Sequence, residues 1–222
     1  MAYIGQAPAN KPVSSSDLED GLITNSKLAQ DIISAETELA EAPADTDEFL
    51  ISDAGTLKRI DASLVGGGGI TEADMYRLTA NTSAGTNATI TSNLERVDTA
   101  GFGHMGTGIS ESSGIFTFPS TGFYLINIYA TIKADSGDTT GNLVLETTTN
   151  NSSYVNAAMA QGGNEGGGAD VIVDGASAFI FDVTDTSTHK CRLKTDSMGN
   201  SFLVGDSNEN TTCISFLRLG DT

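Results

Sequence analysis

The chain has 222 residues and a formal net charge of -18 at pH 7, because 29 Asp and Glu residues stand against only 11 Lys and Arg residues. This charge repels phosphate backbones and anionic lipid headgroups, which argues against nucleic acid and membranes as partners. Tryptophan is absent, and only 18% of the residues are charged. Such a composition is typical of β-rich extracellular or virion surfaces, and it excludes coiled coils and helical bundles as the main architecture.

The sequence lacks the marks of a membrane or secreted protein. It contains no run of about 18 apolar residues, and its N-terminus lacks the basic start and apolar stretch of a signal peptide. We therefore expect synthesis in a cytosol and no membrane insertion. A chain with the composition of an outer surface but no export signal can leave the cell in a virus particle that lysis releases. The expected location is a virion that is assembled in the host cytoplasm.

Four consecutive glycines at residues 66–69 form the sharpest boundary in the sequence. Such a run maximises backbone entropy and interrupts any packed element. We predict a linker at 66–69, which separates an N-terminal part, residues 1–69, from a C-terminal domain, residues 70–222. The N-terminal part has no block of alternating strands large enough to close a core alone, so it must pack against something else.

A ten-residue repeat lies in the N-terminal part, where residues 16–24 superpose on residues 26–34 with Leu18 and Leu28 at equivalent positions. One copy has few side chains to bury, so repeats of this kind become stable by stacking on neighbours or on other copies of the chain. The alternative is a pair of short helices, each with a serine as its N-cap. Both arrangements favour oligomerisation.

Residues 48–61 contain two strand-like runs around a turn signal at 52–55, which predicts a β-hairpin. An isolated hairpin is marginal in water, so this one should pack against other chains or a docking surface. We therefore interpret the N-terminal part as an extended stalk for oligomerisation and attachment to a particle. Its predicted anchor residues are Tyr3, Ile4, Leu18, Leu28, Phe49 and Ile51.

After the glycines, strand-like runs recur with Gly, Asn, Asp and Ser clusters between them. The predicted strands are 75–80, 88–97, 115–118, 123–133, 143–149, 171–173, 177–183, 190–195, 201–204 and 213–219. Short strands at this spacing, with almost no helical periodicity, predict a mainly β fold, namely an antiparallel jelly-roll β-sandwich.

The predicted strand at 123–133 is apolar on both faces over much of its length. One face carries residues such as Tyr124 and Ile126, and the other offers Phe123, Leu125 and Tyr129. A strand of a lone solvated sandwich should alternate between apolar and polar residues, so the second face must be covered, either by another layer of the same chain or by an identical neighbour. Its burial by identical neighbours would contribute several kcal/mol per protomer, in order of magnitude. We favour a homotrimer.

Two segments carry a resemblance to a known family. Residues 116–126, Phe-Thr-Phe-Pro-Ser-Thr-Gly-Phe-Tyr-Leu-Ile, resemble the signature of the complement/tumour necrosis factor-like jelly rolls, and residues 212–219 are similar to the last strand of that family. The resemblance covers about residues 76–222. It implies a compact trimer whose last strand lies next to the three-fold axis. The predicted trimer interface comprises Phe123, Leu125, Tyr129 and Phe216.

The N-terminal part carries a second resemblance. Residues 2–5, the stretch 8–11, the ten-residue repeat and residues 47–53 look like the N-terminal portion of tail-fibre and other virion fibre proteins of marine bacteriophages. This resemblance implies that the N-terminal part fixes a trimer to the particle while a C-terminal knob projects outward.

Two sequence motifs imitate ligand sites but lack the context that such sites need. Residues 101–106 match G-x-G-x-x-G, yet glycines and serines follow and no helix opens there, so we predict an inter-strand loop. Residues 206–210 imitate the start of a calcium loop, but Thr211 and Leu217 stand where glycine and glutamate are required. A weaker calcium site stays open as an alternative, built from Asp135, Asp138, Asp206 and Asn208. We expect no cofactor.

The sequence offers no set of catalytic residues. His104 and His189 stand in no metal-binding or nucleophile motif. We interpret Cys191 and Cys213 as small buried hydrophobic residues, with a single disulfide or a reactive thiol as alternatives. The chain is therefore expected not to be an enzyme.

The function predicted from the sequence is that of a phage tail fibre. Residues 1–69 would bind other virion proteins, and the trimeric knob would contact a host-surface glycan or protein. The candidate contact residues lie in polar loops and are His104, Asp135, Asp138, Asn164, Asp206 and Asn208. Two alternatives remain open: a capsid decoration or head fibre, and a free carbohydrate-binding module that needs no anchor.

Overall fold

The computed structural model describes residues 14, 39, 43–44, 46–65, 69–166 and 169–222. This part of the chain is mainly antiparallel β-structure, which confirms the predicted fold class. The chain divides into two compact units, Met1–Gly67 and Gly68–Thr222. The ten-residue repeat and the predicted anchor residues Tyr3, Ile4, Leu18 and Leu28 lie outside the described residues.

The first unit contains the predicted hairpin, which the structure confirms. Strand β1 (Glu48–Asp53) pairs with β2 (Thr56–Asp61), and a short 3-10 helix, η3 (Ala62–Leu64), follows. The connecting residues Ala54 and Gly55 have φ values of 48° and 86°. Two successive residues in the left-handed region give a turn whose twist matches that of the strands.

The hairpin exposes apolar side chains on both of its faces. Phe49 and Ile51 point to one side and are 41% and 38% exposed, whereas Leu50 and Leu57 point to the other and are 73% and 71% exposed. Arg59 forms an ion pair with Glu48 at 2.8 Å across the two strands. Within the described residues of this unit, the hairpin therefore has no side that forms a core.

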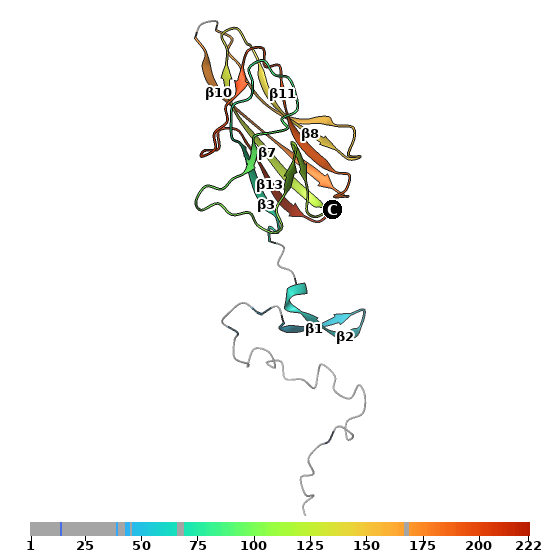
Figure 1. Cartoon of the computed structure of the whole chain (residues 1–222). Coiled ribbons are helices and arrows are strands. Elements are labelled where there is room, and N and C mark those ends of the chain that lie inside the picture. Colours follow the sequence, from blue (N-terminus) through green and yellow to red (C-terminus); the bar gives the residue numbers. More distant parts are fainter. Residues whose placement is uncertain (1–13, 15–38, 40–42, 45, 66–68, 167–168) are drawn as a thin grey trace, which may run out of the picture. The chain divides into compact units, whose positions relative to one another are not determined.

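The second unit is built from two antiparallel sheets (Figure 1). The first sheet has the strand order β10-β7-β13-β3-β4, and β12 pairs with β7. Its strands are β3 (Ala73–Leu78), β4 (Leu94–Arg96), β7 (Gly122–Ala134), β10 (Val171–Val183), β12 (Phe202–Leu203) and β13 (Cys213–Gly220).

The second sheet has the strand order β5-β6-β11-β8-β9. Its strands are β5 (Ser110–Ser112), β6 (Ile115–Thr117), β8 (Gly141–Thr148), β9 (Val155–Gly162) and β11 (Lys190–Asp196). The chain passes repeatedly from one sheet to the other, as between β6 and β7 or β9 and β10. This connectivity is that of a jelly roll.

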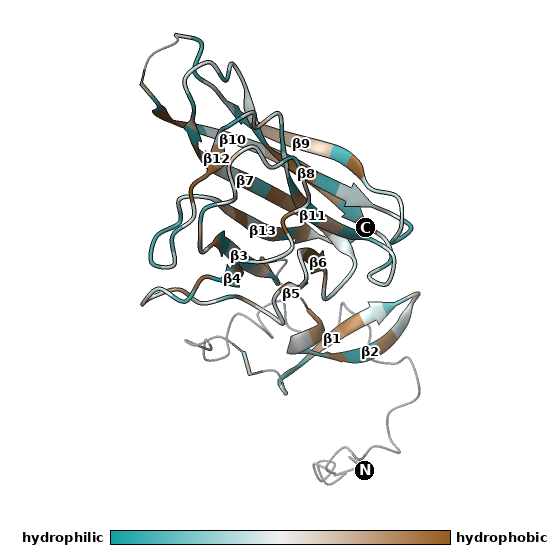
Figure 2. Ribbon diagram, turned by 45° about the horizontal axis from the view of Figure 1, so that its top comes forward, coloured by the Kyte–Doolittle hydropathy of each residue, from teal (hydrophilic) through white to brown (hydrophobic). Residues whose placement is uncertain are grey.

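The core lies between the two sheets. On β7 every second residue is buried, and the alternation of hydrophobic and hydrophilic residues can be followed along the ribbon (Figure 2). The ring of Phe116 lies 5.3 Å from those of Tyr76 and Phe216, and the ring of Phe118 lies 4.7 Å from that of Tyr124. Three aromatic residues of the stretch 116–126, Phe116, Phe118 and Tyr124, therefore occupy the centre of the core.

Several strand boundaries differ from the predictions, and β5 (Ser110–Ser112) was not predicted. Residues 171–183 form one strand instead of two, because Gly175 stays paired with β7 and lets the backbone of Gln161 approach. Of the predicted strand 88–97, only 94–96 belongs to the first sheet. Residues 155–162 form β9, which was not predicted because its small side chains carry little β-propensity.

Candidate functional site

An apolar surface lies on the outer face of β7 and β10, on the side of the first sheet that points away from the core. Phe123 and Tyr129 on β7 are 38% and 36% exposed, and Ile172 and Ile180 on β10 are 60% and 57% exposed. These large side chains are not covered by any described part of the chain. A single sandwich normally places polar residues at such positions.

The pairing register aligns the outward side chains into rows that cross three strands. Ile180, Leu125 and Leu217 form one apolar row. The next rows are Ala178, Asn127 and Ser215, and then Ala176, Tyr129 and Cys213. Small residues separate the large ones, which permits close approach of another protein surface. We call the surface made by these three rows, together with Phe123 and Ile172, the outer apolar face.

The two ionisable groups of the third row, Tyr129 and Cys213, are neutral at physiological pH. Hydrogen bonding to Asp174, together with slight burial, raises the pKa of Tyr129 above its ordinary value. Burial raises the pKa of the Cys213 thiol. Thr131 donates its hydroxyl to Asp174 over 2.8 Å, so this carboxylate at the margin of the face is partnered. The centre of the face therefore carries no net charge.

Three of the four residues predicted for the trimer interface, Phe123, Leu125 and Tyr129, point outward on this face. Phe216 does not. It is 2% exposed, and its ring lies 5.3 Å and 6.0 Å from the rings of Phe116 and Phe118. Side chains alternate along a strand, so Phe216 points into the core. Its neighbour Leu217 occupies the outer position instead.

The outer face of the second sheet has a different character. The Glu146 side chain is only 8% exposed, and it accepts a hydrogen bond from Arg192 over 2.6 Å with Lys194 at 3.9 Å. The guanidinium of Arg192 lies 3.9 Å from the centre of the Tyr154 ring. Val144, which lies on the same face of β8 as Glu146, is fully buried. The outer side of β8 is therefore covered by the chain itself and its carboxylate is ion-paired, whereas Met159 on β9 is 47% exposed.

One group of predicted contact residues lies together but holds loops in place. Ser201 and the backbone N–H of Asn200 donate to the carboxylate of Asp138, and these hydrogen bonds hold its pKa below the ordinary value. Asn164 is buried and donates its N–H to the Asp138 carbonyl over 2.7 Å. The N–H of Asp135 donates to the Ser201 hydroxyl. The Asn164 side chain donates to the Ala169 carbonyl over 3.2 Å, so the side chains of Asp138 and Asn164 are both occupied by structural bonds.

A second group lies in two other loops. Asp206 accepts from the N–H groups of Asn208 and Glu209, at 2.6 Å and 3.0 Å, and so closes its own turn. Thr99 donates its hydroxyl to the Asn208 carbonyl over 3.2 Å, which joins this turn to the loop that carries the exposed His104. The six predicted contact residues therefore divide between two groups of loops.

The described residues contain no group of three or more His, Cys, Asp or Glu side chains arranged as metal ligands. The four residues of the calcium alternative thus do not gather. Cys191 and Cys213 are both free thiols, which corrects the disulfide alternative. In the part of the chain that the structure describes, no helix combines the length and the apolar character that a membrane span needs.

Comparison with known proteins gives a fold but no family. No protein-family model and no curated protein matches the chain. Among solved structures, the chain is similar to Eiger TNF from S. frugiperda, with 15% sequence identity, a TM-score of 0.50 and coverage of 68% of this chain and 93% of that one. Murine APRIL in crystals at pH 8.5 gives 14% identity, a TM-score of 0.49, and coverage of 67% and 98%. The likeness to Eiger TNF shows that the second unit is a jelly roll of the TNF type.

Sequence reasoning missed Ile172, Ile180 and Leu217 as members of the outer apolar face. The signal for the first two was the alternation along β10, which becomes visible only when residues 171–183 are treated as one strand. The signal for Leu217 was the inward position of its neighbour Phe216.

Proposed function

We propose that the chain is a non-enzymatic structural protein of a bacteriophage particle, a tail fibre whose C-terminal domain forms a trimeric knob for host attachment. The observation that carries this proposal is the outer apolar face. Its exposed aromatic and aliphatic side chains need a cover, and a second and third copy of the same face supply one.

The character of the two faces supports a closed oligomer instead of an open chain of copies. Only one of the two sheets is apolar outside, while the other pairs its charges internally. When three such faces meet around an axis, water is excluded from Leu125, Ile180 and Leu217, and the second sheet of each copy stays in solvent. The net charge of -18 per chain also keeps the trimers apart from one another.

The N-terminal part supports the attachment role. Its hairpin exposes Phe49 and Ile51 on one side and Leu50 on the other, and an isolated hairpin of this kind needs a partner surface. In the proposal, residues 1–69 bind other virion proteins, and the knob contacts a glycan or protein of the host surface. The resemblance of the first residues to virion fibre proteins motivates the location in the particle.

Sedimentation equilibrium of the full chain tests the trimer. The expected mass is three times the 22.9 kDa of one chain, and a stable monomer would overturn the proposal. Immunogold labelling of phage particles tests the location. Label at the tail supports a tail fibre, label spread over the shell supports a decoration or head fibre instead, and the absence of label from purified particles contradicts a virion role.

A further inference from the structure

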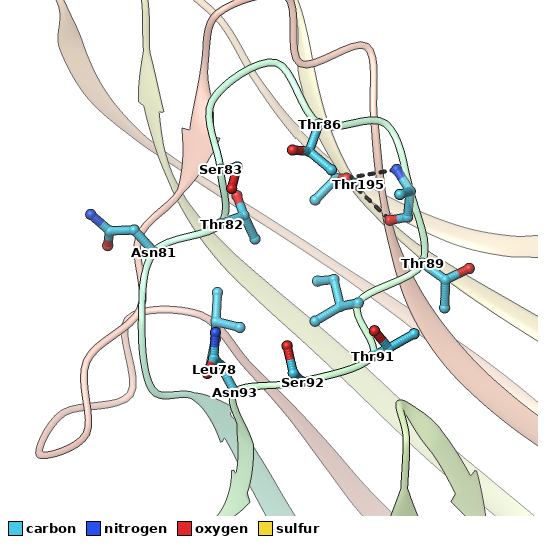
Figure 3. A pocket seen from close by; sticks show the side chains of 12 residues that line it. Leu78, Asn81, Thr82, Ser83, Thr86, Thr89, Thr91, Ser92, Asn93 and Thr195 are labelled. Atoms are coloured by element: carbon cyan, nitrogen blue, oxygen red, sulfur yellow. Dashed lines mark hydrogen bonds between the residues drawn. The ribbon is translucent and has the colours of Figure 1, made fainter.

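A polar pocket lies in the loop between β3 and β4, away from the outer apolar face. The loop runs around it as a ring, so that residues 79–93 form its rim (Figure 3). The pocket has a volume of about 180 Å³. Its lining consists of Leu78, Asn81, Thr82, Ser83, Thr86, Ala88, Thr89, Ile90, Thr91, Ser92, Asn93 and Thr195.

Hydrogen bonds on both sides hold the ring open. On one side, Thr82 donates its N–H to the Leu203 carbonyl over 3.1 Å, and its hydroxyl accepts from the Leu203 N–H over 3.0 Å. On the other side, Ile90 donates its N–H to Leu193 over 2.9 Å, and Thr195 donates to Ala88 over 2.9 Å. The loop is thus fixed to both sheets, and a ligand would not have to order it.

Several polar side chains of the ring have no hydrogen-bond partner in the described part of the chain. They are Thr86 and Thr89, which are half-buried, and Ser83, Thr91, Ser92 and Asn93, which are exposed to solvent. Thr86 and Ser92 point into the ring, whereas Thr89 points away from it (Figure 3). Hydroxyl and amide groups both donate and accept, which is what a sugar hydroxyl requires of its neighbours.

The lining residues also set the charge and size of the ligand. No Lys, Arg, Asp or Glu lines the pocket, so a carboxylate, phosphate or ammonium group would find no ion partner there. Leu78 and Ile90 contribute an aliphatic floor, suited to the C–H groups of a sugar ring. The volume is below the roughly 300–1,000 Å³ of pockets for drug-sized ligands, which limits the occupant to about one ring.

We propose that this ring binds one uncharged sugar residue of a host-surface glycan. The proposal rests on the attachment role of the knob and gives it a ligand class. None of the lining residues belongs to the outer apolar face, so the pocket stays accessible in a trimer. A pocket without aromatic side chains binds a single sugar weakly, with a dissociation constant of about 1 mM. The three pockets of one trimer together raise the overall affinity for a glycan-coated surface.

Amide chemical-shift titration of the full chain tests this inference. Glucose, galactose, mannose and N-acetylglucosamine serve as neutral probes, and glucuronic acid and sialic acid as charged ones. At least one neutral sugar should shift the amide signals of residues 82–93, and the charged sugars should not. If no neutral sugar shifts them at concentrations well above about 1 mM, the inference fails. Shifts caused by charged sugars alone would overturn the assignment of an uncharged ligand.

Two matched variants locate the site. Thr86→Val removes a hydroxyl that points into the ring, and Thr89→Val removes one in the same loop that points away. We expect Thr86→Val to weaken binding about tenfold and Thr89→Val to leave it unchanged. Equal effects of the two variants would overturn the assignment to this pocket. Dispersed amide spectra check that each variant is folded, and sedimentation of the same samples separates a failure of sugar binding from a failure of the trimer.

Discussion

The outer faces of the two sheets of the jelly roll differ in polarity and in exposure to solvent. The second sheet buries Glu146 between Arg192 and Lys194 and leaves β8 covered along its whole length. The first sheet leaves Ile180 and Tyr129 exposed in rows with small residues between them. A face that satisfies its own charges needs no partner, whereas an apolar face without a cover indicates one. The difference assigns assembly to one sheet only.

The largest effect should come from a charge on the outer apolar face. Leu125→Glu would place carboxylates at the centre of the proposed trimer, where each loses its hydration without gaining a partner. We expect association to weaken by more than about a thousandfold, so that sedimentation gives the mass of a single chain. Met159→Glu is the control, because Met159 is 47% exposed on the outer face of the second sheet. Equal loss of assembly in both variants would contradict the assignment.

The second prediction concerns the stability of the charged face. Glu146→Gln leaves Arg192 and Lys194 without their carboxylate, which should lower the free energy of unfolding by about 2 kcal/mol. Asp174→Asn on the opposite sheet should change it by less than about 0.5 kcal/mol. Urea unfolding in the Leu125→Glu background measures both without a contribution from assembly. A larger loss of unfolding free energy in Asp174→Asn than in Glu146→Gln would contradict this prediction.

The third prediction compares the two thiols, one on the outer apolar face and one in the core. Cys213 lies on the outer apolar face and Cys191 in the core, and burial raises the pKa of both thiols. Trimer formation should slow iodoacetamide labelling of Cys213 about tenfold relative to the Leu125→Glu variant, because a covered thiolate is harder to form and to reach. Cys191 should react only as the chain unfolds. Mass spectrometry of the labelled peptides distinguishes the two sites, and equal rates for Cys213 would contradict its burial in the trimer.

The smallest effect should be a loss of stability in acid. Hydrogen bonds from Ser201 and Asn200 lower the pKa of Asp138 from its ordinary value of 3.8. A lowered carboxyl pKa stabilises the fold above the pKa of the unfolded chain, and this contribution is lost as the pH falls through the folded pKa. Asp138→Asn should therefore flatten the decline in unfolding free energy below about pH 4. An unchanged pH profile in that variant would show that Asp138 adds nothing.

The fold could be predicted from the sequence because its strongest signals are local. The stretch 116–126 predicts a strand, a turn with Pro and Gly and an aromatic strand, and its residues Phe116, Phe118 and Tyr124 form the centre of the core. β9 gave no such signal. Three of its residues are alanines, which carry little β-propensity, and it is a strand because it pairs with β8.

The candidate site could be predicted only in part, because it depends on pairing register. The outward position of Leu125 and Tyr129 follows from alternation along one strand. Their alignment with Ile180 and Leu217 depends on which strands are neighbours, and the sequence does not specify that order. The pocket in residues 79–93 was missed because its serines and threonines resemble those of any loop until the backbone closes into a ring.

The position of β13 in the first sheet also constrains how this unit folds during synthesis. β13 lies between β7 and β3, both of which precede it in the chain. During synthesis, β13 cannot pair with these two strands until residues 213–220 have left the ribosome, and until then the facing edges of β3 and β7 present unpaired backbone groups. Closure of the first sheet depends on contacts between residues about 140 positions apart, so chaperone binding should matter more for the yield of this unit than for that of a domain with local contacts.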